Sequence, residues 1–175
     1  MKNFYRYMEI RKMNRKLTKT ALLAVILMSS FYFSNYLSAQ QAAFTQMKNH
    51  LSYKGYKCEI DVQGKFSRLR CVTDKAYPNF SIRPQSGGFL ISSYFSGSQY
   101  AKRHRAAFLN LVNNLNVLAI ATRYYVDKDT DLALEVWMPG ENYDKTGFDG
   151  TIDNFNSDWD RIFAKFGDEV RLFLR

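Results

Sequence analysis

The chain has 175 residues with a formal net charge of +9, and 46% of its residues are hydrophobic and 16% aromatic. This length suits one domain, and the apolar and aromatic content excludes a mostly disordered chain. The charge is concentrated at the front, because residues 1–39 hold seven of the 25 basic residues but only one of the 16 acidic ones. The remaining 18 basic and 15 acidic residues leave residues 40–175 with a charge of +3, which disfavours a nucleic-acid binder.

Residues 1–39 have the pattern of a signal peptide for export. The basic segment Arg15–Lys19 precedes an apolar stretch, and Leu37 and Ala39 occupy the −3 and −1 positions of a cleavage site before Gln40. No cysteine lies near this site, which excludes a bacterial lipoprotein anchor. We therefore expect residues 40–175 to form a single domain that is exported to the periplasm or cell envelope, or secreted.

Two alternatives to this interpretation stay open. Met13 is a more economical start than Met1, because the first twelve residues lengthen the basic region without improving the pattern. An uncleaved anchor is the second alternative, since Thr20–Ala39 is long enough to cross a bilayer, which takes about 20 residues. Several serines dilute the second half of this segment, so the pattern favours cleavage. If the segment is kept, it is the expected membrane contact.

The two cysteines are predicted to form a disulfide across a β-hairpin. Cys58 and Cys71 lie in two alternating runs around Gly64-Lys65, which suits a two-residue turn of type II′. In that register Cys58 lies opposite Cys71 as a non-hydrogen-bonded pair, with Cα atoms about 4.5 Å apart. The same register opposes two charge pairs, Glu59 with Arg70 and Asp61 with Arg68. Export favours the disulfide over two buried free thiols.

The spacing of apolar residues, together with residues that end helices or strands, predicts the remaining elements. The pattern predicts a helix over Ala42–Lys54, strands over Phe80–Arg83 and Phe89–Phe95, a second helix capped by Ser98, and a hairpin of Leu118–Asp127 with Asp131–Met138. A final amphipathic helix is predicted from Phe148 to Phe166, and residues 170–174 are too short to classify. The expected fold is α+β, with helices packed on an antiparallel sheet of about five strands. Its expected order is helix, three or four strands, helix, two strands, helix.

One stretch resembles a known family. Residues 108–116 read FLNLVNNLN and lead into Arg123–Val136, which resembles the second half of YbjN-like domains. Those domains share the fold of type III secretion chaperones, with a helix that ends in an Asn-rich turn and then a hairpin with an acidic tip. The resemblance covers about residues 42–166, on loose apolar patterns without catalytic residues. It implies a protein-binding or regulatory module, commonly dimeric. The family has three strands before the middle helix and works in the cytoplasm, whereas this chain has three or four and an export signal.

Several candidate sites have plainer alternatives. Asp127–Asp131 matches the first carboxylates of a calcium-binding EF-hand loop, but Leu132 stands at its glycine position, so a hairpin tip is favoured. Neither His50 nor His104 has ligand-like spacing to a cysteine, and we expect no metal or other cofactor. Carboxylates that could pair for hydrolysis are Glu141, Asp149, Asp153, Asp158 and Asp160. Asp149 and Asp153 share one helical face, but they flank the apolar stripe, as solubilising charges usually do.

The expected function is therefore binding rather than catalysis, with no catalytic residue assigned. A basic cluster near the start of the second helix suits an anionic partner or a solvated face, and exposed tyrosines suit a partner surface. The candidate binding residues are Tyr94, Tyr100, Lys102, Arg103, Arg105, Tyr124 and Tyr125. The expected partner is an envelope protein, with self-pairing as a second option. The alternative function is a small envelope hydrolase or ligand carrier that uses surface carboxylates.

Overall fold

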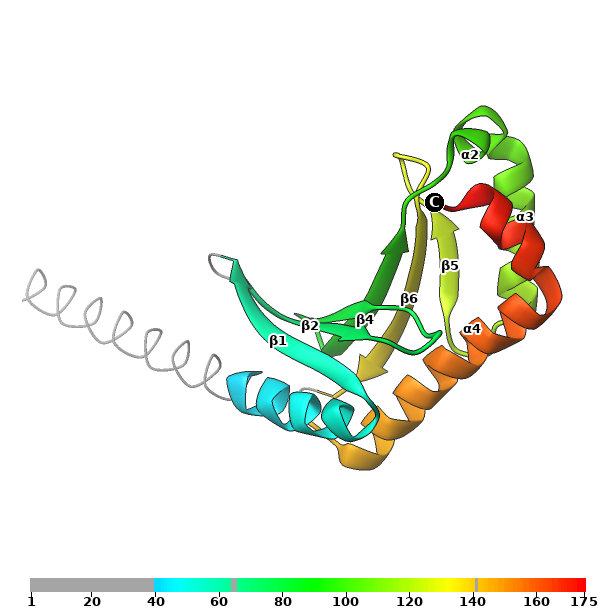
Figure 1. Cartoon of the computed structure of the whole chain (residues 1–175). Coiled ribbons are helices and arrows are strands. Elements are labelled where there is room, and N and C mark those ends of the chain that lie inside the picture. Colours follow the sequence, from blue (N-terminus) through cyan, green and yellow to red (C-terminus); the bar gives the residue numbers. More distant parts are fainter. Residues whose placement is uncertain (1–39, 64–65, 141) are drawn as a thin grey trace, which may run out of the picture. The chain divides into compact units, whose positions relative to one another are not determined.

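A computed structural model describes residues 40–63, 66–140 and 142–175, and residues Ala42–Arg175 form one unit. The predicted signal peptide and its cleavage site precede Gln40 and lie outside the described residues. The elements are helix 40–53, β1 (Tyr56–Gln63), β2 (Phe66–Thr73), β3 (Phe80–Gln85), β4 (Gly88–Phe95), α2 (Gln99–Arg103), α3 (Arg105–Leu118), β5 (Arg123–Val126), β6 (Leu132–Pro139) and α4 (Lys145–Phe173) (Figure 1).

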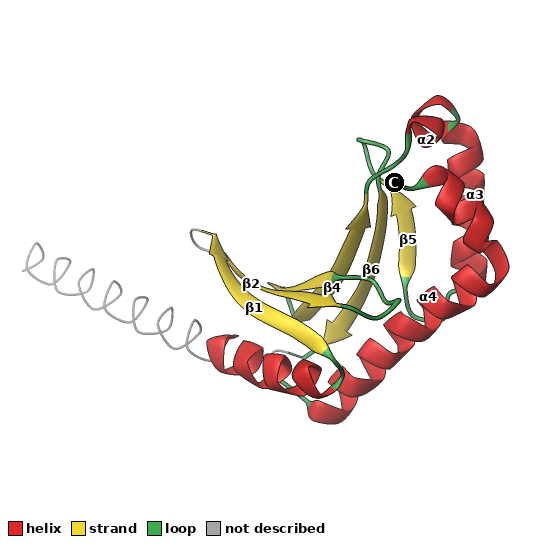
Figure 2. Cartoon of the chain, in the orientation of Figure 1, coloured by secondary structure: helices red, strands yellow, loops and turns green. Residues whose placement is uncertain are grey.

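The six strands form one antiparallel sheet in the order β1-β2-β3-β4-β6-β5. Helix 40–53, α3 and α4 all lie on one side of this curved sheet (Figure 2). The predicted α+β class and the predicted order of elements are confirmed. The sheet has six strands where about five were predicted, and four of them precede the middle helices.

The core lies between the helices and the sheet face that they cover. Phe44, Met47 and Leu51 recur at helical spacing and are fully buried. The stripe of α4 packs against the same core through Phe148, Ile152, Phe155, Trp159 and Ile162. Burial of each large apolar side chain contributes about 1.5–3 kcal/mol, so these stripes are the main force that holds the helices to the sheet.

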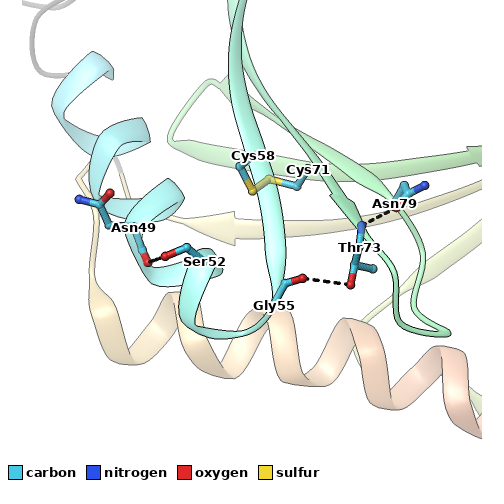
Figure 3. Close-up of a disulfide and its surroundings, with 7 residues drawn as sticks. All are labelled: Asn49, Ser52, Gly55, Cys58, Cys71, Thr73 and Asn79. Carbon is cyan, nitrogen blue, oxygen red and sulfur yellow. Dashed lines mark hydrogen bonds between the residues drawn. A yellow bond between two sulfur atoms is a disulfide. The ribbon is translucent and has the colours of Figure 1, made fainter.

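The first hairpin has the predicted register. Cys58 pairs with Cys71, Glu59 with Arg70 and Asp61 with Arg68, and Gln63 pairs with Phe66 on either side of the predicted turn. That turn, at residues 64 and 65, lies outside the described residues. Cys58 and Cys71 form a disulfide with Cα atoms 4.1 Å apart, and both residues are buried against the core (Figure 3). Thr73 closes the open end of the hairpin, because its hydroxyl donates to the Gly55 carbonyl at 3.2 Å.

The second hairpin begins later than predicted. The predicted strand over Leu118–Asp127 is wrong in its first half, since α3 continues to Leu118 and β5 begins at Arg123. The physical reason is Asp158, a fully buried carboxylate on α4. It accepts the backbone N–H groups of Ile120, Ala121 and Thr122 at 2.8–2.9 Å, so these groups are not available for a sheet ladder.

The bounds of the two later helices also differ from the prediction, and the last helix begins at Lys145. The second helix is capped by Ser98 as predicted, but it breaks at His104 into α2 and α3. The last helix continues past Phe166 to Phe173, although Phe166 itself has non-helical φ and ψ of −124° and 16°. Residues 170–173 therefore belong to α4, and Leu174 forms a β-bridge with Gly97. This bridge fixes the C-terminus beside the end of β4.

Candidate binding surface

The described helices all lie against one face of the sheet (Figure 2), and we call the other face the open face. Its residues are the alternate positions of each strand that point away from the core: Lys57, Glu59 and Asp61 on β1, Arg68 and Arg70 on β2, Ser81 and Arg83 on β3, Leu90, Ser92 and Tyr94 on β4, Arg123 and Tyr125 on β5, and Ala133, Glu135 and Trp137 on β6. Residues one position away along the strands, such as Leu69, Ile82 and Ile91, are fully buried. The two faces thus follow from the period of two in strand side chains.

Four arginines and three carboxylates lie among the described residues of the open face. Arg68 donates to Asp61 from Nε at 2.9 Å and from a terminal guanidinium nitrogen at 2.7 Å. Arg123 donates to Glu135 at 2.9 Å, whereas Arg83 approaches the other Glu135 oxygen only to 3.9 Å. The charge of Arg83 is therefore only weakly neutralised, and the side chain is more than half exposed. A surface of this kind favours an anionic partner.

Glu135 is the centre of a hydrogen-bond network on this face. Its side chain is only 8% exposed, and it accepts from Arg123 and from the Tyr125 hydroxyl at 3.0 Å. Burial, together with hydrogen bonds to Tyr94 and Glu135, raises the pKa of Tyr125, so its hydroxyl stays a donor at neutral pH. The guanidinium of Arg123 also lies 5.5 Å from the centre of the Tyr125 ring. These contacts fix the side chains before any partner binds.

Two hollows interrupt the open face. The first, of about 460 Å³, is lined mainly by β2, β3 and β4, including Arg68, Arg70, Ser81, Ser92 and Tyr94. The second, of about 800 Å³, is lined by Arg83, Gln85, Leu90, Arg123, Glu135 and Trp137 among others. Tyr94 is 53% exposed and Trp137 50% exposed beside these hollows. Large aromatic side chains next to arginines are the composition typical of binding hot spots.

Of the predicted binding tyrosines, two lie together on the open face. Tyr94 and Tyr125 both pair with Ala133 of β6, from β4 and β5 respectively. Tyr124 was predicted to be on the same surface, and this is wrong, because it is 2% exposed and belongs to the core. Consecutive residues of a strand point to opposite faces, so Tyr124 and Tyr125 cannot share one surface.

The other predicted binding residues lie at the α2 end of the molecule. Tyr100 stacks on His104 and also packs against Phe173 of α4. Lys102 and Arg103 are exposed on α2. Arg105 donates to the Asp127 carbonyl and the Thr130 hydroxyl, each at 3.0 Å, so it holds the hairpin tip. In the predicted basic cluster, Lys102 and Arg103 are therefore exposed to solvent, whereas Arg105 makes a structural contact.

The acidic segment Asp127–Asp131 forms the tip of the second hairpin. The Asp127 carboxylate accepts the backbone N–H groups of Asp129 and Asp131 at 2.9 Å. Asp131 in turn accepts the N–H of Gly97, also at 2.9 Å, and a side chain at Gly97 would collide with the Thr130 carbonyl. These carboxylates hold backbone groups, and within the described residues no cluster of three or more potential ligands is placed to hold a metal ion.

Among the described residues, the remaining acidic candidates do not all lie at one site. Asp158 is fully buried and is bound by three backbone N–H groups and by Arg161 at 2.7 Å. Asp149 and Asp153 share the Lys54 ammonium at 2.6 Å, and Asp160 is exposed. Glu141 lies outside the described residues.

Sequence reasoning missed several residues of the open face, namely Arg68, Arg70, Arg83, Glu135 and Trp137, as binding residues. It paired Arg68 and Arg70 in the correct register but assigned them only a stabilising role. A signal was present, because Arg83 and Glu135 are charged residues at alternate positions of their strands, and Trp137 lies two residues after Glu135 and so on the same face. Recognising it required the strand order, which brings β3, β4 and β6 side by side.

A scan of the sequence against protein-family models and a search of curated proteins find no match. In the part of the chain that the structure describes, no helix combines the length and apolar character needed to cross a membrane.

Proposed function

We propose that this protein is a non-enzymatic binding module, exported to the periplasm or cell envelope, and that its partner is a protein that docks an acidic segment on the open face. The observation that carries this proposal is that half-exposed Tyr94 and Trp137 lie on the same open face as Arg83, whose charge is only weakly neutralised. Tyrosine, tryptophan and arginine are the residues most enriched at protein-binding hot spots. The resemblance to YbjN-like domains points to the same class of function.

The disulfide supports the exported location. Disulfides persist in oxidising compartments and are rare in the cytosol. Cys58 and Cys71 are buried as a cross-strand pair, and no free cysteine is found among the described residues.

The alternative of a hydrolase is weakened by where its carboxylates lie. A general acid–base pair needs two carboxyl groups that face one substrate. Asp158 is engaged by backbone N–H groups, and Asp149 and Asp153 are bridged by Lys54. These residues stabilise contacts between elements, and binding is the function that the geometry favours.

The test is site-specific photo-crosslinking in cells that express the full chain. A photoreactive residue at Trp137 or Tyr94 should give an adduct of one defined mass, either with an envelope protein or with a second copy. The control position is Tyr100, an exposed tyrosine on α2. Equal crosslinking at Tyr100 and at the open face would contradict the proposal.

A second test compares the adduct formed at Tyr94 in two matched variants. Arg83→Ala removes a mostly exposed cation and should weaken the adduct formed at Tyr94, because the acidic segment loses a charge partner. Lys102→Ala removes an exposed cation from α2 and should leave that adduct unchanged. If both variants behave alike, the arginines of the open face do not bind the partner.

A further inference from the structure

A separate hollow, of about 520 Å³, is lined by helix 40–53 and by the chain from Tyr143 to Asp149. None of its lining residues belongs to the sheet, so it is distinct from the open face. Its volume is within the range of small-molecule sites. The lining residues are Gln46, Asn49, His50, Tyr53, Lys54, Tyr143, Lys145 and Asp149.

Helix 40–53 presents a polar and aromatic stripe to this hollow. Gln46, Asn49, His50 and Tyr53 are spaced by three, one and three residues, which places them on one helical face. The apolar residues of the same helix form a different stripe and are buried in the core. The side chain of Tyr53 is 92% exposed and does not contribute to the core. An exposed ring at the rim of a hollow is available for stacking on a ligand.

A hydrogen-bond network holds the polar groups of this site in place. His50 bonds through Nδ1 to the Tyr143 hydroxyl at 2.7 Å and through Nε2 to Asp149 at 2.8 Å. In the neutral imidazole, a donor at Nε2 leaves Nδ1 as the acceptor, so Tyr143 donates to it. Phe148 packs edge-on against both rings, at 5.4 Å from the centre of His50 and 5.6 Å from that of Tyr143. The site is thus ordered without a ligand.

The charges of the site are nearly balanced. Lys54 and Lys145 bring two positive charges, and Asp149 brings one negative charge. Lys54 is also bound to Asp153 at 2.6 Å, which supplies a second carboxylate beside the hollow. Hydrogen bonds from Lys54 and from His50 lower the pKa of Asp149, so it is ionised at neutral pH. Because positive and negative charges balance, the hollow has no preference for an anionic or a cationic ligand. Its specificity for a ligand must therefore come from ring faces and hydrogen bonds.

We propose that this hollow binds a neutral carbohydrate, with the Tyr53 and Tyr143 rings against the sugar faces and Gln46, Asn49 and Asp149 hydrogen-bonded to its hydroxyl or acetamido groups. A sugar has an apolar C–H face and a polar rim, which matches rings flanked by amides and a carboxylate. The Asn49 and Gln46 amides donate and accept, as a hydroxyl does. The inference is independent of the function proposed for the open face.

The experiment is calorimetric titration of the protein from cells that express the full chain. The probes are the trimers of N-acetylglucosamine and of glucose, with inorganic phosphate as an anion. We expect at least one trisaccharide to bind with a Kd of about 1 mM or tighter, and phosphate not to bind. Binding of phosphate alone, or of no probe at all, would overturn the proposal.

Two variants locate the binding. Tyr53→Ala removes a ring that is almost fully exposed, so the fold should be unaffected, and the trisaccharide should bind at least about tenfold more weakly. Trp137→Ala removes an exposed ring from the open face and should leave sugar binding unchanged. Asn49→Ala is a second surface variant that should also weaken binding. Equal affinity in Tyr53→Ala, Asn49→Ala and the unmodified protein would refute the site.

Discussion

Asp158 provides the sharpest test of how the helices and the second hairpin are joined. Its carboxylate is fully buried, accepts three consecutive backbone N–H groups from Ile120, Ala121 and Thr122, and pairs with Arg161. Asp158→Ala leaves these three donors without the buried carboxylate that accepts them. Removing one partner of a buried, hydrogen-bonded charge typically costs about 3–5 kcal/mol, and we expect a loss in the free energy of unfolding of that size.

The control is Arg161→Ala, which removes only a partly exposed partner of the same carboxylate. The Arg161 side chain is 41% exposed, so its loss should cost no more than about 1 kcal/mol. Urea unfolding followed by circular dichroism measures both variants. An Asp158→Ala loss within about 1 kcal/mol of the Arg161→Ala loss would refute the assignment of Asp158 as the main link between α4 and residues 120–122.

The stabilisation that Asp158 provides should also depend on pH and be lost in acid. Burial by itself would raise the pKa of Asp158, but the three backbone N–H groups and Arg161 outweigh it and lower the pKa. A carboxyl with a lowered pKa stabilises the fold above its ordinary value of about 3.9, and this contribution is lost as the pH falls through the folded-state value. The difference between the unmodified protein and Asp158→Ala should therefore be constant near neutral pH and shrink below about pH 4. A difference that stays constant into acid would contradict the ionised carboxylate.

Three further predictions concern the sulfur bridge and the tyrosines. Replacing Cys58 and Cys71 by serine removes a link across 13 positions and should cost about 3 kcal/mol of unfolding free energy, measured in urea; an unchanged midpoint would contradict this. Tyr124→Ala should cost about 3–5 kcal/mol, as a buried ring does, and Tyr94→Ala less than about 1 kcal/mol; equal losses would contradict the assignment of Tyr124 to the core and Tyr94 to the open face. Burial raises the pKa of Tyr56 to about 12, so its neutral form stabilises the fold up to the ordinary value of about 10 and this contribution is lost as pH rises through 12. Tyr56→Phe should flatten that alkaline decline, and a parallel decline in both proteins would refute it.

The first hairpin shows what a sequence can determine locally. The turn signal, the two charge pairs and the cysteine pair all required the same register, and that register is found. Each of these constraints acts between residues close in the sequence, so no knowledge of the rest of the fold was needed. The amphipathic stripe of α4 was predictable for the same reason, since its spacing is a property of one segment.

The errors arose where a distant residue decides a local conformation. Residues 118–122 read as an apolar strand, and only Asp158, on a helix far along the chain, shows where the N–H groups of residues 120–122 are satisfied. The contacts of His50 with Tyr143 and Asp149 likewise join positions more than ninety residues apart, and no spacing rule connects them. Tyr124 and Tyr125 were both predicted as binding residues, because a tyrosine suits either a core or a partner surface, and the pairing of β5 with β6 decides which of them faces the helices.

The open face differs from a loop surface in how its side chains are held. Glu135 fixes Arg123 and Tyr125 by hydrogen bonds, and the strands beneath fix the spacing between neighbouring rows at about 4.8 Å. Side chains ordered in this way lose less rotamer entropy when a partner binds. Arg83, which is only loosely paired, can turn toward an incoming carboxylate without breaking a close ion pair. If the open face binds a protein as proposed, Arg123 would present a fixed charge and Arg83 a movable one, and an extended acidic segment could contact both where a single free anion could not.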